Sequence, residues 1–187
     1  MKTNKPNQET VEIAFAEVLL ALNLDLNDSN LKETPARLAK MYINELFSGL
    51  YENEPSVKEF ESDSSGFLYT KVPFRSTCAH HFQPIKGDVH IFVDYSDSDV
   101  VFGLSKFNRL VGHISSRPTL QEGLTKQILE SLVEKLGTDN VMVIVEASHH
   151  CVTDRGVCAA YSSTLTQHTY SKSNEFINLC NVYFKRS

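Results

Sequence analysis

The sequence has no long apolar run and no excess of positive charge. None of its uninterrupted apolar stretches approaches the roughly 20 residues that a membrane-spanning helix needs. The first residues lack the apolar core of a signal peptide. The formal net charge of −5 disfavours non-specific nucleic-acid binding, which requires a basic surface. We therefore expect a cytoplasmic protein without nucleic-acid or membrane partners, although a local basic pocket for a phosphorylated small molecule is compatible with this charge.

Internal repeats, linkers and low-complexity tracts are also absent. A chain of 187 residues can bury a substantial core. Its 41% hydrophobic and 22% charged residues are typical of globular proteins and exclude a disordered or fibrous chain. We predict one domain over residues 1–187, with a helical N-terminal part over residues 1–50 and a core over residues 67–187.

Cysteine is scarce, with four residues in the whole chain. In the reducing cytoplasm, cysteines are seldom joined in disulfides. The four thiols are therefore expected to be metal ligands or buried side chains.

Hydrophobic periodicity predicts an α+β domain. Helical spacing is present over residues 7–24, 34–49, 107–114, 120–136 and 174–184. Strand patterns cover residues 67–75, 87–95, 100–102, 141–145 and 161–169. Thr34 is expected to be the N-cap of the second helix, and Gly137 to end the fourth. Residues 51–66 are expected to form a loop.

Two compact clusters of cysteine and histidine lie beside strand-like sequence, at residues 78–81 and 149–151. Catalytic zinc takes three protein ligands and leaves a fourth position for water. The Cys-x-x-His spacing lets Cys78 and His81 reach one ion from a single turn, and we choose Cys151 as the third ligand. Such a thiolate-rich set favours zinc over magnesium or calcium. His80 and His149 would then remain unligated and available for proton transfer.

A structural zinc site is the main alternative, and it usually has four protein ligands and a closed coordination shell. An isolated Cys-x-x-His also occurs by chance, and most single histidines are surface or hydrogen-bonded core residues. Two such dense clusters in a chain with seven histidines favour a metal site.

Five ordered motifs carry a resemblance to a known family: ETPARLAKM from Glu33, CAHHF from Cys78, GLSKFNR from Gly103, QEGLT from Gln121 and HHCVTDRG from His149. On these motifs the chain resembles the GTP cyclohydrolase I family over nearly its whole length. The resemblance implies the tunnelling fold, in which antiparallel sheets and helix pairs from several subunits close into a barrel. It also implies a homodecamer built from pentamers, with active sites between subunits.

The resemblance implies a zinc-dependent hydrolysis of GTP. The imidazole ring opens, C8 leaves as formate, and rearrangement gives 7,8-dihydroneopterin triphosphate. In this scheme Cys78, His81 and Cys151 hold Zn2+, whose bound water becomes nucleophilic near neutral pH. His80 and His149 are expected to move protons.

The resemblance also implies the substrate contacts. Glu122 resembles the guanine anchor, because a carboxylate can accept hydrogen bonds from both N1–H and the 2-amino group, and Gln121 would support that edge. The triphosphate contacts would be Arg37, Ser105, Lys106, Arg109 and Arg155. Taken singly, each charged residue could equally be a solvated surface group.

The sequence departs from the family at Ala79, where most members have glutamate, and at Gly123, where arginine is usual. The segment after Thr166 is short and lacks the usual glycine-rich passage. These changes remove none of the proposed ligands or triphosphate contacts, but they could remove support around the site.

Two other functions remain open at this point. One is a divergent tunnelling-fold paralogue that acts on another purine or pterin, which the four proposed phosphate-binding cations disfavour if that substrate is not phosphorylated. The other is a non-catalytic, zinc-containing regulatory homologue, which would have four protein ligands.

Overall fold

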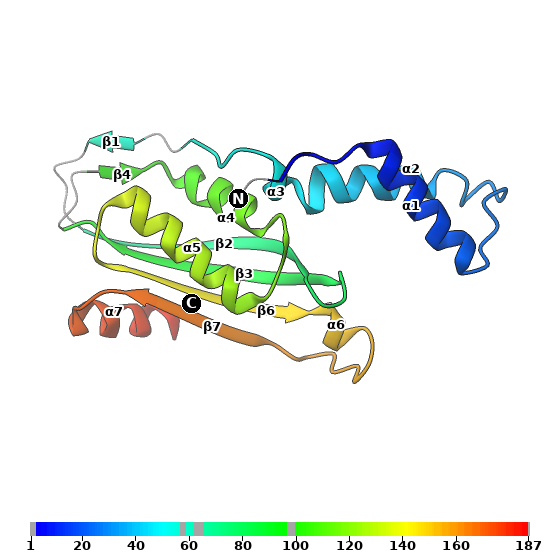
Figure 1. The fold of residues 1–187 in the computed structure, drawn as a ribbon. Helices are drawn as coiled ribbons and strands as arrows, with labels where there is room; N and C mark the ends of the chain where they lie inside the picture. Colours follow the sequence, from blue (N-terminus) through cyan, green and yellow to red (C-terminus); the bar gives the residue numbers. More distant parts are fainter. Residues whose placement is uncertain (1–2, 57–58, 62–65, 97–99, 187) are drawn as a thin grey trace. The chain divides into compact units, whose positions relative to one another are not determined.

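The structure is a computed structural model that describes residues 3–56, 59–61, 66–96 and 100–186 (Figure 1). The chain divides into two compact units, Met1–Asn53 and Glu54–Ser187.

The first unit is helical. It contains α1 (Gln8–Ala21), α2 (Thr34–Met41), the π-helical turn η1 (Tyr42–Leu46) and the short α3 (Ser48–Tyr51). The Asn7 side chain caps α1 by accepting a hydrogen bond from the Thr10 backbone N–H. No residue of α1 is buried, and three of its large apolar side chains, Ile13, Val18 and Leu20, are more than half exposed, as is Leu22 at the C-cap. Helices lie where the sequence predicts them, but the one expected over residues 34–49 is divided into α2, η1 and α3. Apolar side chains of α1 remain exposed.

The prediction that Thr34 caps α2 is wrong, because Glu33 occupies the N-cap position and Thr34 is already helical. The backbone N–H of Thr34 donates to the carbonyl of Leu31, so the turn before the helix carries the chain into it one residue early.

The second unit is built on a five-stranded sheet in the order β5-β2-β3-β6-β7. Its strands are β2 (Phe67–Cys78), β3 (Pro84–Asp94), β5 (Pro118–Thr119), β6 (Val141–His149) and β7 (Thr164–Tyr170). All neighbours are antiparallel except β2 and β5. Two further strands, β1 (Glu59–Glu61) and β4 (Val100–Phe102), form a separate pair.

Helices cover both faces of this sheet. Figure 1 shows α4 (Leu104–Ser115) and α5 (Gln121–Leu136) on one face and α7 (Asn174–Phe184) on the other. Alternation along β3 serves both layers, because Val89 and Ile91 belong to the core under α4 and α5 while Phe92 belongs to the core under α7. This arrangement confirms an α+β fold. None of the helices in the described part of the chain has the length and apolar character to cross a bilayer.

Most predicted elements are confirmed, including α7 at both ends and the left-handed Gly137 (φ 62°) that ends α5. The expected loop over residues 51–66 is wrong in part, because it contains β1; residues 57–58 and 62–65 of this stretch lie outside the described residues. The strand expected from residue 161 begins at Thr164.

Strand register brings distant parts of the sequence to one end of the sheet. The β2–β3 hairpin pairs Thr77 with Pro84, and the β3–β6 ladder pairs Ile85 with His149. The last residue of β2, Cys78, also lies opposite Thr119 of β5, two residues before α5 begins. Both Cys/His clusters and the start of α5 therefore meet at this end.

Gly87 is needed for the close approach of β3 to β6 near this end. A Cβ atom at Gly87 would lie 2.0 Å from the carbonyl oxygen of Glu146 and 2.6 Å from the Cα of Ala147. Both contacts are to backbone, so a side chain here would push the strands apart.

We predict that Gly87→Ala destabilises the fold by about 1–3 kcal/mol or more, because overpacking must displace strand backbone. The matched control is Gly112→Ala in α4, where a Cβ would meet nothing within 4 Å. Alanine there should stabilise the helix by up to about 1 kcal/mol. Urea unfolding at equal protein concentration measures both, and similar stabilities for the two variants would contradict the packing described.

His90 of β3 is a buried histidine away from the clusters. Its Nδ1 lies 2.9 Å from the hydroxyl of Tyr69, and the ring of Phe184 meets it edge-on at 4.9 Å. Burial lowers the pKa of His90 from 6.5, the charge of Lys71 lowers it further, and Asp88 and Glu146 oppose the shift. The folded state therefore favours the neutral ring.

This pKa predicts a pH-dependent stability. Above the ordinary pKa of 6.5 the contribution of His90 is fully present, and it is lost as the pH falls towards the lower folded pKa, because the unfolded chain binds the proton more readily. From about pH 7.5 to about pH 5.5, the free energy of unfolding should fall more steeply for the wild type than for His90→Gln. Equal slopes in urea titrations would refute this assignment.

Candidate metal centre

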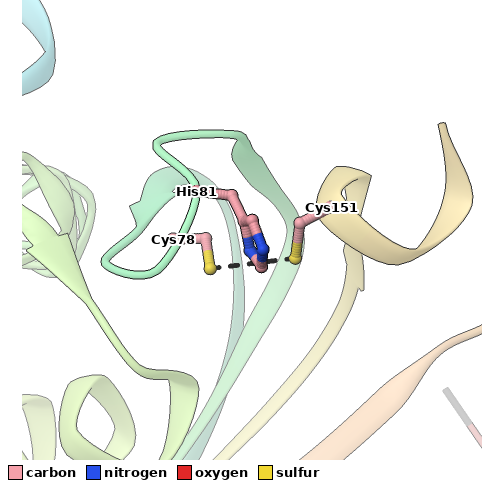
Figure 2. Close-up of side chains that lie close together, drawn as sticks. All are labelled: Cys78, His81 and Cys151. Carbon is pink, nitrogen blue, oxygen red and sulfur yellow. Dashed lines mark hydrogen bonds between the residues drawn. The ribbon is translucent and has the colours of Figure 1, made fainter. Parts of the chain in front are cut away.

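Cys78 and His81 are brought together by a tight loop at the end of β2. The Cys78 backbone N–H donates to Gln83 O (2.8 Å), and the Phe82 N–H donates to Cys78 O (2.9 Å). Phe82 takes the left-handed conformation (φ 54°) that this loop needs. The two backbone bonds close the chain around His81, and Figure 2 shows its imidazole turned toward the thiol of Cys78.

Cys151 comes from α6 (His150–Thr153), a single turn of helix that begins where β6 ends. Its Sγ lies 3.7 Å from Sγ of Cys78, and the nearest possible ligand atoms of Cys78, His81 and Cys151 all lie within 4.8 Å of one another. Cys78 is buried, Cys151 is half-buried and His81 is exposed. The cluster can therefore hold a metal ion, as the sequence predicts, and it faces solvent on one side.

The electrostatics of the two thiols favour a bound cation. All four cysteines are free, so Cys78 and Cys151 are not joined in a disulfide. Burial, followed by the neighbouring thiol of Cys78, raises the pKa of Cys151, while Arg155 opposes the shift. Two thiolates this close repel each other, and a metal cation would reverse the balance by binding both in their deprotonated form.

His149, the last residue of β6, is hydrogen-bonded to the first residue of α5. Its Nε2 is 2.7 Å from Oε1 of Gln121. Burial lowers the pKa of His149, and the negative charge of Glu122 opposes the shift. Glu122 itself is exposed in the first turn of α5, so a carboxylate and an imidazole stand together beside the cluster. His80 is exposed in the loop after β2, with its ring centroid 6.3 Å from that of His81.

Gln121 is buried, unlike the neighbouring Glu122, which is exposed. Its side chain is 1% exposed, and both ends of its amide are hydrogen-bonded within the chain. The predicted contact of Gln121 with guanine stays a prediction.

The structure does not bring all predicted phosphate-binding residues to the cluster. Arg155 lies just after α6, near enough to Cys151 to influence its thiol. Ser105, Lys106 and Arg109 occupy the first turns of α4, and it is the other end of this helix that leads to β5 and Cys78. The Nζ of Lys106 is 3.4 Å from the carbonyl of Ser56.

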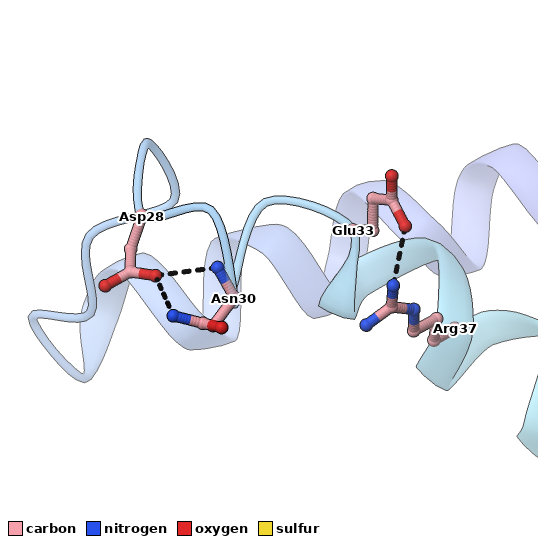
Figure 3. A network of polar contacts seen from close by, with 4 residues as sticks. All are labelled: Asp28, Asn30, Glu33 and Arg37. Carbon is pink, nitrogen blue, oxygen red and sulfur yellow. Dashed lines mark hydrogen bonds and ion pairs between the residues drawn. The ribbon is translucent and has the colours of Figure 1, made fainter.

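Arg37 belongs to the first unit, and Figure 3 shows its local setting. Its guanidinium forms an ion pair with Glu33 one helical turn earlier (2.7 Å), and both side chains are more than 60% exposed (69% and 61%). Beside it, Asp28 accepts from the backbone and side chain of Asn30. Exposed pairs of this kind contribute little to stability, so Arg37 can exchange Glu33 for another anion at small cost.

Sequence reasoning missed two polar groups near the site. His150 Nδ1 lies 2.7 Å from Asp154 Oδ2, and the signal for this pair is the spacing of four residues on one helix face. Thr125 and Thr166 lie behind Gln121, and no local pattern predicts that they meet.

The two departures from the family pattern are neighbours in space. The backbone N–H of Ala79 donates to Thr119 O (3.1 Å), and a Cβ at Gly123 would lie 3.8 Å from Thr119 Oγ1. Compared with the family pattern, Ala79 removes a negative charge and Gly123 removes a positive one, so the net charge around Thr119 is unchanged. The departures are therefore compatible with an intact metal cluster.

Comparison with known proteins identifies what this chain is similar to. The family model described as GTP cyclohydrolase I matches residues 11–180. GTP cyclohydrolase 1 of Erwinia tasmaniensis is 47% identical over 156 residues, which are 81% of this chain and 70% of the relative. The enzyme of the same name from an Enterobacter species is 43% identical over 167 residues, 87% of this chain and 74% of the relative. That of Serratia proteamaculans is 46% identical over 156 residues, with coverages of 81% and 70%.

We predict that Cys151→Ala abolishes stoichiometric metal binding, since two remaining ligands cannot form the three-ligand set. Cys158→Ala is the matched control, because Cys158 is exposed in the loop after α6 and lies outside the cluster. Metal content after dialysis and gel filtration measures both. A Cys151→Ala protein that retains one tightly held ion per chain would show that the site lies elsewhere.

Proposed function

The chain belongs to the GTP cyclohydrolase I family, and on this premise we propose that Cys78, His81 and Cys151 hold the zinc ion used in GTP hydrolysis. The reaction opens the imidazole ring of the guanine, releases C8 as formate and yields 7,8-dihydroneopterin triphosphate. When bound, zinc lowers the pKa of a water molecule and so supplies a nucleophile near neutral pH.

The observation that carries the zinc proposal is the spacing of the two thiols. Two thiolates that bind one tetrahedral zinc at about 2.3 Å each would lie about 3.8 Å apart. Sγ of Cys78 and Sγ of Cys151 are 3.7 Å apart. Among the residues that the structure describes, the group has three members, which favours a catalytic site with an open position over a closed structural site.

The neighbouring residues suit the handling of a guanine ring. Glu122 presents a carboxylate at the N-terminus of α5, where it can accept from N1–H and the 2-amino group. His149 is near enough to Glu122 to feel its charge, and its lowered pKa keeps a neutral, proton-accepting ring near neutral pH. His80, exposed on the loop beside His81, is proposed as a second proton carrier.

The triphosphate site is proposed to form between copies of the chain. From Lys106 to the end of α4 at Ser115 the helix rises roughly 14 Å, directed toward the metal end of the sheet. We therefore propose that the α4 residues Ser105, Lys106 and Arg109 bind the triphosphate of GTP at the metal cluster of a neighbouring copy. Arg155 would bind the triphosphate at the cluster of its own chain. We propose that Arg37 also contacts this triphosphate.

Exposed strand edges and apolar side chains support assembly. Among the described strands, β7 pairs with β6 alone, and the outer edge of β2 is covered only at Thr77 and Cys78. Free edges of this length invite pairing with another copy. We propose that such pairing closes the tunnelling barrel and yields a decamer of two pentamers. The exposed apolar side chains of α1 are a further surface for these contacts.

We also propose that the reaction takes place in the cytoplasm, because free thiols persist there and the metal site requires two of them.

The test is a GTP assay with zinc-loaded protein, in which formate and an oxidisable, fluorescent pterin should appear together. Glu122→Gln should lower kcat/KM by about 10- to 100-fold, since one charge-assisted contact is lost. The matched control is Glu130→Gln on the same helix, whose exposed pair with Lys126 (3.6 Å) contributes little.

A zinc-loaded oligomer that does not turn over GTP would contradict the proposal. Turnover of a different purine or pterin in a substrate panel would then favour the divergent paralogue, and binding of GTP without turnover would favour a regulatory homologue.

A further inference from the structure

Gln121 has a hydrogen-bonding environment that fixes which way its amide points. Its Nε2 donates to the carbonyl of Val145 on β6 and to the carbonyl of Thr164 at the start of β7, both at 2.9 Å. Carbonyl oxygens only accept hydrogen bonds. The reverse orientation would set the amide oxygen against two other oxygens inside the protein, which leaves buried acceptors unsatisfied. The nitrogen must therefore face the strands.

Two threonines next to Gln121 form hydrogen bonds whose donors can also be assigned. Thr125 Oγ1 donates to the backbone carbonyl of Gln121 (2.8 Å), which uses its single hydrogen. The hydroxyl of Thr166, 2.6 Å away, must then donate to Thr125. Its oxygen lies 3.2 Å from Gln121 Nε2, whose two hydrogens already point to the carbonyls of Val145 and Thr164, so it can only share one of them. Thr125 is fully buried, and the donor and the acceptor of each hydrogen bond in this network are therefore assigned.

With the nitrogen facing the strands, Oε1 of Gln121 is the atom that faces His149. It lies 2.7 Å from His149 Nε2 and can only accept. Nε2 must therefore carry the hydrogen, and in the neutral ring Nδ1 carries none. His149 is not part of the metal-ligand cluster, so its Nδ1 is not required as a ligand.

We propose that Gln121 is a positioning residue that sets the tautomer of His149 and makes Nδ1 the ring nitrogen that exchanges protons with the substrate. This inference rests on the proposed function, in which His149 is a proton carrier. The Nε2–H bond to Gln121 is the same in the neutral and the protonated ring, so the imidazole keeps its orientation while Nδ1 accepts a proton and later returns it. Strand β6 and the start of β7 thus fix the amide of Gln121, and this amide in turn holds the imidazole ring of His149.

The direct test is nitrogen-15 NMR of the full-length, zinc-loaded protein labelled at histidine, at about pH 8, where an ordinary histidine is neutral. The His149 signals are assigned by their loss in His149→Gln. The wild type should show a protonated, slowly exchanging Nε2 and an unprotonated Nδ1. An Nδ1–H tautomer would overturn the inference, whether or not GTP is turned over.

A variant then separates positioning from substrate binding. Gln121→Leu removes the acceptor, so we expect the Nε2–H signal to exchange rapidly and kcat to fall by about 10- to 100-fold. KM for GTP should change little. A rise in KM with unchanged kcat and an unchanged His149 signal would make Gln121 a guanine contact instead.

Thr166→Val is the matched control, because Gln121 keeps both carbonyl acceptors without it. Its His149 signals and kcat should stay close to wild type, and loss of the Nε2–H signal in Thr166→Val would contradict an orientation fixed by the carbonyls. Should Gln121→Leu fail to fold, the wild-type spectrum alone still decides the tautomer. A protein with the predicted tautomer that does not turn over GTP would contradict the proposed function and leave the assignment of Nδ1 and Nε2 standing.

Discussion

The close approach of two thiols, one at the end of β2 and the other in the helical turn that follows β6, is the constraint on which the site depends. Sγ of Cys78 and Sγ of Cys151 are 3.7 Å apart although 73 positions separate them in the chain. That distance follows from the register of β2, β3 and β6, and from Gly87, which lets the last two strands touch backbone to backbone. Because the thiols resist ionising together, the same geometry that assembles the cluster also favours a cation.

The site also depends on a second, polar junction at the same end of the sheet. Gln121 ties the start of α5 to β6 and β7 while its oxygen holds His149. The proposed metal ligands come from the end of β2, the loop after it and α6, whereas the proposed proton carrier His149 is hydrogen-bonded to the buried Gln121. An imidazole held in this way beside a cluster that could hold a metal suits the proposed reaction, which needs several proton transfers.

Local chemistry explains how much could be predicted. Cys-x-x-His spacing and three- and four-residue periodicity act over one turn, so α5, α7 and the pairing of Cys78 with His81 could be predicted from local patterns. Cys151 lies 73 positions from Cys78 and could be chosen only through its place in the second Cys/His cluster. The role of Gln121, the capping of α2 and the contact of Thr125 with Thr166 depend on tertiary placement that no local pattern contains. Lys106 and Arg109 show a further limit, because their distance from the cluster within one chain follows from the direction of α4 and is visible only in three dimensions.

X-ray absorption at the zinc edge tests the central claim most directly. For the zinc-loaded wild type, the account predicts two sulfur ligands at about 2.3 Å and two lighter ligands, one imidazole nitrogen and one exchangeable oxygen, at about 2.0–2.1 Å. A shell with three or four sulfurs, a shell of light atoms alone, or four protein ligands without an exchangeable oxygen would contradict a catalytic site made by Cys78, His81 and Cys151.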